Sequence, residues 1–250
     1  MQDILQKAKA TIPSLDDIFS EAMKSIEREK VSNRFGEVLV HLDELATEIY
    51  KKYEREAIRK LAEEWVSRQK EEVRGKMKEI LSQEGWDKFV EKAKRLFADF
   101  GFLVQALEKD LGNMRKARGG KTFEKAVLKL LELIGIKGEI PQGQAREKLQ
   151  RIDIVIPSID KAVETPDRAF FLACKRTLRE RWKQEVPTAQ PNRRIYLVTL
   201  DEILPENKAN EIRARGLIAF VRDSLKDEKH LIDKPWIRRL SDLPKELVVR

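Results

Sequence analysis

The chain has 250 residues with one cysteine and two histidines, and it carries a net charge of +8 at a pI of about 9.4. The single cysteine excludes an internal disulfide and a cysteine-based zinc site, and two distant histidines disfavour a multi-histidine centre. Carboxylates must therefore hold any metal, which favours Mg²⁺ or a similar hard cation. The basic charge favours a polyanionic partner, for which nucleic acid and an anionic membrane both qualify, and the alternative is a basic protein without such a partner.

No apolar run reaches the roughly 18 residues that span a bilayer. The first residues also lack the basic segment and the apolar block of a signal peptide. We therefore expect a cytoplasmic protein without a membrane partner.

The N-terminal part of the sequence is typical of a helical region. Ser14 and Asp17 can cap a helix that runs to about Lys30. Apolar residues then recur every three or four positions from about Phe35 to Leu81, which predicts one very long helix, and a third helix begins near Trp86. The ordinary interpretation of this apolar stripe is core packing, and the alternative is that the long helix also reaches a second subunit.

From residue 137 the pattern changes to short apolar runs rich in branched and aromatic residues. We predict strands over 151–156, 169–174, 194–199 and 217–221, separated by helices near 178–186 and 206–214. This order predicts an α/β layered fold. We expect residues 1–112 to form a helical region that serves dimerisation, DNA clasping or both, and residues 113–250 to form the α/β core.

The first two predicted strands carry the most informative pair of residues. Asp153 lies in the first strand and Lys175 ends the second. If the strands form a hairpin with its turn near residue 164, the two side chains fall almost opposite each other, about 5 Å apart on one face. Asp153 can then bind Mg²⁺, while Lys175 positions the attacking water and offsets phosphate charge. The alternative interpretation is an ordinary cross-strand salt bridge.

One carboxylate rarely suffices for Mg²⁺, so a second acid is required. Glu124 lies at the edge of the apolar face of the predicted helix 122–134, and Glu185 lies in the helix that follows Lys175. Either glutamate can complete the metal site, and either can instead be a solvated surface residue.

Two clusters of charge are candidate DNA contacts. The first, Arg115–Lys121, contains Arg115, Lys116, Arg118 and Lys121 and leads through two glycines into a predicted helix N-terminus, where phosphate is favoured. A flexible solvated loop is the competing interpretation. The second cluster contains Arg179, Glu180 and Arg181. It is either a salt-bridged surface or a reader of a C·G pair, because carboxylate accepts from cytosine and guanidinium donates to guanine.

These motifs together resemble the restriction endonucleases of the EcoRII group, which cut CCNGG-like and related CCGG-containing sites. The resemblance rests on Arg115-Lys116-x-Arg118-x-Gly120-Lys121-x-x-Glu124, on Asp153, and on Lys175-x-Thr177-x-x-Glu180-Arg181-Trp182-x-Gln184, and it covers roughly residues 113–245. It implies a PD-(D/E)xK nuclease core, which is a central mixed sheet flanked by helices, in a prokaryotic restriction-modification enzyme. It also implies Mg²⁺-dependent cleavage of double-stranded DNA to a 5′-phosphate. A palindromic site favours a homodimer.

The resemblance also implies individual roles. Asp153 is the first metal ligand, Lys175 the catalytic lysine and Glu124 the helix acid near the metal. Arg179, Glu180 and Arg181 read bases, and Arg115 and Arg118 contact the DNA backbone or support the site.

The sequence departs from the group at the second acid. The usual acid two residues before the lysine is replaced by Ala173, and the position about 13 residues after the lysine, where the group places its acid, is Thr188. Glu185 or Glu124 must then take this role. The dipeptide Pro166-Asp167 lies too close to Lys175 to be the motif's PD.

Two other functions remain open. A structure-specific repair or junction-resolving nuclease on the same core would not need the 179–181 cluster. A non-catalytic basic DNA-binding protein would give Asp153 and Lys175 no role.

Overall fold

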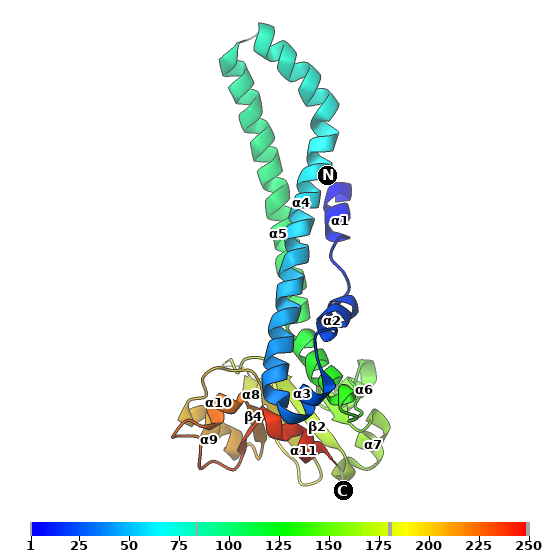
Figure 1. The fold of residues 1–250 in the computed structure, drawn as a ribbon, viewed down its shortest axis with the longest axis vertical. Coiled ribbons are helices and arrows are strands. Elements are labelled where there is room, and N and C mark those ends of the chain that lie inside the picture. Colours follow the sequence, from blue (N-terminus) through cyan, green and yellow to red (C-terminus); the bar gives the residue numbers. More distant parts are fainter. Residues whose placement is uncertain (1, 84, 180–181, 249–250) are drawn as a thin grey trace. The chain divides into compact units, whose positions relative to one another are not determined.

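A computed structural model describes residues 2–83, 85–179 and 182–248 (Figure 1). Its helices are α1 (Gln2–Lys9), α2 (Leu15–Met23), α3 (Arg28–Asn33), α4 (Phe35–Gln83), α5 (Trp86–Leu133), α6 (Gly143–Lys148), α7 (Ile159–Glu164), α8 (Trp182–Glu185), α9 (Glu206–Ala214), α10 (Asp223–Lys226) and α11 (Leu243–Leu247), with the short 3-10 helices η1 (Pro166–Arg168) and η2 (Leu240–Asp242). The strands are β1 (Ile154–Ile156), β2 (Phe170–Lys175), β3 (Arg194–Thr199), β4 (Ile218–Val221) and β5 (Ile237–Arg239). No helix within these ranges is both long and apolar enough to cross a bilayer.

The chain divides into two compact units. The helical unit comprises Met1–Ser20 and Ala46–Arg118, and the sheet unit comprises Glu21–Leu45 and Gly119–Arg250. Residues 21–45 thus group with the sheet, whereas the sequence places them in the N-terminal helical region. The functional division at residues 112 and 113 stays a prediction.

The helical unit is built around the paired segments of α4 and α5 (Figure 1). Leu61 of α4 and Leu107 of α5 are fully buried, and the rings of Trp65 and Phe100 lie 5.2 Å apart. The very long helix predicted from about Phe35 is confirmed as α4. Leu42 and Leu61 of its apolar stripe are fully buried, as the core-packing interpretation expects, whereas Ile58 is 38% exposed, and contact with a second subunit stays a prediction.

The helix that begins after Ser14 is shorter than predicted. Ser14 and Asp17 form the expected reciprocal cap, with the Asp17 amide donating to the Ser14 hydroxyl at 3.2 Å. The helix ends at Met23 rather than near Lys30. The Ser25 hydroxyl donates to the Ala22 carbonyl at 3.0 Å, so a side chain occupies an acceptor that a continuing helix would use.

The sheet unit contains a five-stranded mixed sheet in the order β1-β2-β3-β4-β5. The β1 and β2 strands are antiparallel, and the other neighbouring pairs are parallel. Four of these strands correspond to the predicted ones, although β1 covers only the second half of the predicted 151–156 because Arg151 has a left-handed φ. The helices between the strands match the expected layered order. The sequence did not predict β5, because only Ile237 of its three residues is buried and so no apolar pattern marks it.

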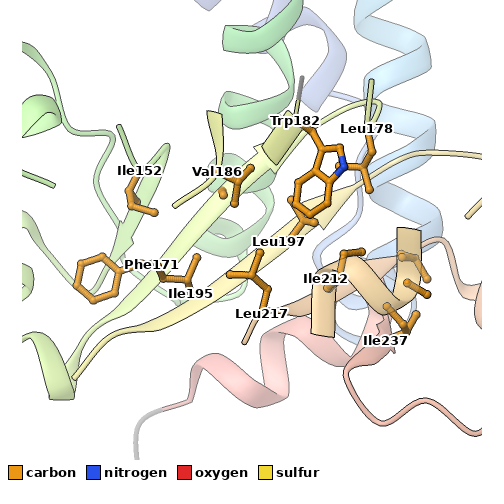
Figure 2. Close-up of a cluster of buried hydrophobic side chains, with 14 of the residues drawn as sticks. Ile152, Phe171, Leu178, Trp182, Val186, Ile195, Leu197, Ile212, Leu217 and Ile237 are labelled. Atoms are coloured by element: carbon orange, nitrogen blue, oxygen red, sulfur yellow. The ribbon is translucent and has the colours of Figure 1, made fainter. Parts of the chain in front are cut away.

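Both faces of the sheet are covered by apolar residues. One face meets α8 and α9, and Figure 2 shows Trp182, Ile212 and Leu197 within this core. On the other face the rings of Phe170, Tyr196 and Phe220 follow one another at 5.7 and 5.3 Å. Coverage on both faces explains why the parallel strands read as continuous apolar runs rather than as alternating ones.

Candidate active site

Four elements of the sheet unit bring the predicted acids and the lysine together. Asp153 directly precedes β1, Lys175 is the last residue of β2, Glu124 lies on α5 and Glu185 ends α8. The apolar face expected for the helix around Glu124 is confirmed, because Phe123 of this face is fully buried. Packing of that face holds the neighbouring Glu124 inside the unit.

Asp153 is the centre of the cluster and is only 2% exposed. Its Oδ2 accepts a hydrogen bond from the Cys174 amide at 2.8 Å and lies 3.9 Å from Lys175 Nζ. Its Oδ1 lies 3.3 Å from Nη2 of Arg146, on α6. Both oxygens of this carboxylate are therefore oriented by neighbouring donors, as a preorganised ligand requires.

The expected register of the hairpin is wrong by two residues. Ile154 pairs with Leu172, so Asp153 falls opposite Ala173, and Lys175 is its diagonal neighbour. The connection between the strands contains α7 and η1 rather than a tight turn, and Pro166-Asp167 lies in η1. A shift of two residues leaves every side chain on the same face of a strand, so the apolar pattern cannot distinguish the two registers. Asp153 and Lys175 still meet.

Glu124 and Asp153 form a buried pair of acids. Glu124 is 6% exposed. Burial, followed by the neighbouring charge of Asp153 and their mutual hydrogen bond, raises the pKa of Glu124 to about 7. Burial also raises the pKa of Asp153, although the Lys175 ammonium opposes this shift. Two acids that resist simultaneous ionisation in this way are suited to bind a cation that compensates both charges.

Glu185 has a different environment. Its carboxylate lies 3.2 Å from Lys175 Nζ, its side chain is 58% exposed, and it borders a cavity of about 660 Å³. It therefore contacts the lysine rather than Asp153. Thr188, which occupies the position of the group's usual acid, lies beyond the end of α8. Among the described residues, no group of three or more acidic, histidine or cysteine side chains is arranged to hold a metal.

The donor set of Asp153 and Glu124 fits Mg²⁺. This ion is usually held by one or two carboxylates, with water and substrate phosphate completing its coordination. Two buried carboxylates that lie together on a sheet edge match this requirement. The chemistry of the pair thus agrees with the metal expected from the sequence.

The predicted phosphate site at a helix N-terminus is wrong. Residues 115–121 lie inside α5, which continues without interruption from Trp86 to Leu133. Amide groups in the middle of a helix donate to the carbonyls of the preceding turn and are not open to phosphate. The two glycines are accommodated within the helix, and nothing lies within 4 Å of a side chain placed at Gly119.

The four basic residues of this segment differ in their contacts: the two arginines contact other residues of the helical unit, and the two lysines are exposed. Arg115 forms ion pairs with Glu54 and Glu108, and Arg118 lies 4.5 Å from the Tyr50 ring centre while donating to the Pro13 carbonyl. Both arginines thus have structural contacts within the helical unit. Lys116 and Lys121 are exposed.

The predicted base-reading cluster is described only in part. Arg179 is exposed, and its carbonyl accepts from the Trp182 amide at 2.9 Å. Glu180 and Arg181 lie outside the described residues, so their assignment stays a prediction from the sequence.

Two further charged residues of the site were missed by sequence reasoning. Arg146 contacts Asp153 and lies 4.0 Å from Glu124 Oε1, and Arg176 donates to the buried Asp43 of α4. Burial raises the pKa of Asp43, and the Arg176 guanidinium opposes that shift. No signal in the sequence separates these two arginines from the other cations, because the chain has 51 lysine and arginine residues.

Solved structures with the same fold are DNA complexes of restriction enzymes. A complex of metal-depleted Ecl18kI with uncleaved, modified DNA has a TM-score of 0.72 at 16% identity, over 98% of this chain and 81% of that chain. A complex of the restriction endonuclease PspGI with substrate DNA has a TM-score of 0.61 at 22% identity, over 95% and 92% of the two chains. At this identity the likeness establishes the fold, which is that of PD-(D/E)xK restriction endonucleases.

Two sequence comparisons complete the picture. An uncharacterized protein in the DsaVM 5′ region of Dactylococcopsis salina is 35% identical over 69 residues, which is 27% of this chain and 58% of that relative. The family model described as EcoRII C terminal matches residues 84–243, which is more than half of the chain. The protein therefore belongs to the EcoRII-like family of type II restriction endonucleases.

Proposed function

We propose that the protein is an Mg²⁺-dependent endonuclease that cleaves double-stranded DNA at a short palindromic site rich in G·C pairs, of the CCGG or CCNGG type. The observation that supports this most is the Asp153–Glu124 pair with Lys175 at 3.9 Å from Asp153. The arrangement lies at the edge of a mixed sheet shared with two restriction enzymes whose structures contain DNA.

Each side chain has a distinct part in the proposed reaction. Asp153 and Glu124 would hold the metal, which when bound polarises the scissile phosphate and lowers the pKa of a water molecule. Lys175 orients the attacking water and stabilises negative charge that develops on the phosphate. Glu185 holds the ammonium of Lys175 in place from the solvent side, since their charged atoms lie 3.2 Å apart.

Digestion of plasmid DNA with Mg²⁺ tests this proposal. A site-specific enzyme yields discrete bands whose sequenced ends share one palindrome, whereas a structure-specific nuclease leaves ordinary duplex intact and cuts branched DNA. A non-catalytic binding protein leaves both substrates uncut. Because a two-fold dimer reads a palindrome most simply, we further propose that two copies of the chain act together.

The two candidate acids are expected to differ in their effect on cleavage. Glu124→Gln should slow the single-turnover rate by about 100-fold, or about 2.7 kcal/mol, because the buried carboxylate is a proposed metal ligand. Glu185→Gln should slow it less than about tenfold, because this exposed residue acts only through Lys175. Equal losses, or a larger loss for Glu185→Gln, would assign the second ligand to Glu185.

The base-reading assignment predicts a loss that depends on the DNA sequence. Glu180→Ala should weaken binding of the cognate duplex by about 1–3 kcal/mol, because a carboxylate directed into the groove accepts from a cytosine amine. Binding of random DNA should change little, since phosphate repels a carboxylate. Competition binding at fixed salt measures both affinities, and equal losses would show a structural role for Glu180.

A further inference from the structure

The buried acids of the site create an electrostatic problem for DNA binding. Asp153 and Glu124 are 2% and 6% exposed, and a DNA phosphate would bring further negative charge to the same place. Charges with little access to water repel strongly and require nearby cations. The cations that face this pair are Lys175 from β2 and Arg146 from α6.

Of these two cations, Arg146 is placed to serve both acids. Its Nη2 lies 3.3 Å from Asp153 Oδ1 and 4.0 Å from Glu124 Oε1. Lys175 instead lies 3.9 Å from Asp153 and 3.2 Å from the exposed Glu185, so it faces one buried and one exposed carboxylate. Within the described part of the chain, Arg146 is the cation recorded within 4.0 Å of both buried carboxylates.

The local backbone holds Arg146 close to Asp153. The Arg146 carbonyl accepts from the Arg151 amide at 2.7 Å. Gln150 and Arg151 adopt left-handed φ values of 58° and 60°, which are unfavourable for residues other than glycine. This turn reverses the chain between α6 and β1, so that two residues seven positions apart meet. The Arg146 side chain is 40% exposed, so part of its guanidinium faces solvent.

We propose that Arg146 is a positioning residue of the active site, whose guanidinium neutralises the Asp153–Glu124 pair and competes with a divalent cation for the same carboxylate oxygens. This inference rests on the proposed function and adds a cation to its site. Two consequences of opposite sign follow. Without a divalent cation, Arg146 strengthens DNA binding because it offsets the buried negative charge. With a divalent cation, Arg146 weakens cation binding because the guanidinium and the cation compete for the same carboxylate oxygens.

Arg146→Gln tests both consequences in the full-length protein. Fluorescence anisotropy measures binding of a duplex that contains the site cut by the wild type, first in EDTA and then during titration with Ca²⁺. In EDTA the variant should bind about tenfold more weakly, which is about 1.4 kcal/mol. In the titration it should reach its full affinity at a lower Ca²⁺ concentration than the wild type. Arg146→Lys keeps the charge and should restore most of the binding in EDTA.

Lys148→Gln is the matched control, because it removes one exposed cation from the same helix. It should change the affinity in EDTA less than about twofold, as loss of one solvated charge predicts. A double-mutant cycle adds a second measurement. In a Glu124→Gln background the effect of Arg146→Gln should be smaller, because one of the two charges that Arg146 compensates has been removed.

The outcomes separate this inference from the proposed function. If the wild type cuts no DNA with Mg²⁺, the proposed function fails. If the wild type cuts DNA but Arg146→Gln and Lys148→Gln bind alike in EDTA, the role of Arg146 is overturned. A higher Ca²⁺ requirement in Arg146→Gln, or no coupling to Glu124, overturns it as well. A purely structural role for Arg146 would weaken DNA binding and Ca²⁺ binding together.

Discussion

Asp153→Asn is expected to slow DNA cleavage by about 1,000-fold or more, which corresponds to about 4 kcal/mol of transition-state stabilisation. The carboxylate is the most buried of the proposed metal ligands, and each of its oxygens has an oriented neighbour. An amide can still accept from the Cys174 amide, so the fold should persist while the charge that binds the cation is lost. Single-turnover cleavage with enzyme in excess over DNA measures the effect.

The control for this substitution is Asp160→Asn on α7, which changes an exposed carboxylate in the next element. This variant should cleave at the wild-type rate. Asp153→Asn should unfold at a temperature close to that of the wild type and should bind cognate DNA in EDTA at least as well, because it removes a charge that repels phosphate. Cleavage by Asp153→Asn within about tenfold of the wild type would remove Asp153 from the active site.

Lys175→Ala should also slow cleavage by about 1,000-fold, for a different reason. Its ammonium group lies 3.9 Å from Asp153 Oδ2 and 3.2 Å from Glu185 Oε2, and the side chain is 21% exposed. A cation held in this position can orient water and stabilise charge on the phosphate in the transition state, with little reorganisation. Rate measurements over a range of Mg²⁺ concentrations distinguish a lost catalytic group from weakened metal binding.

If Lys175 acts on the water and the phosphate, the rate of Lys175→Ala should stay low at saturating Mg²⁺. Recovery of the wild-type rate at high Mg²⁺ would show instead that Lys175 only supports the metal ligands. Lys161→Ala on α7 is the control, since this lysine is exposed and lies between the two strands in sequence. It should leave both the rate and the Mg²⁺ dependence unchanged.

Both predictions depend on a site assembled from elements that are separate in the sequence. In the sequence, the last part of α5 and the α6 helix lie between Glu124 and Asp153. The α7 and η1 helices lie between Asp153 and Lys175. In the proposed function, burial of the acids among cations would allow the site to attract a metal and still accept a polyanion. Arg176 directly follows Lys175, and its contact with Asp43 joins the first part of α4 to the C-terminal end of β2. This contact provides a structural reason why residues 21–45 group with the sheet unit.

The sequence alone determined the elements with strong periodicity. The apolar stripe along α4 and the short apolar runs of β2 and β3 are unambiguous. Burial of one helix face or of a whole strand directly determines the spacing of apolar residues along the sequence. It also predicted that Asp153, Lys175 and Glu124 belong to one cluster, and the structure brings these three side chains together, while their catalytic roles stay a proposal. The resemblance to the EcoRII group rested on the same residues.

Only the tertiary structure decided the features that local patterns do not encode. The register of β1 and β2 differs by two residues from the expected one, since period-two alternation is unchanged by such a shift. The α5 helix continues through Gly119 and Gly120, because burial of Leu107 before them and Phe123 after them outweighs a cost of about 1 kcal/mol for each glycine. Arg146 lies beside Asp153 because of the turn between α6 and β1, and no periodicity of apolar residues predicts that turn. Long-range packing selects such contacts, and it therefore placed Glu124 beside Asp153 and Glu185 beside Lys175.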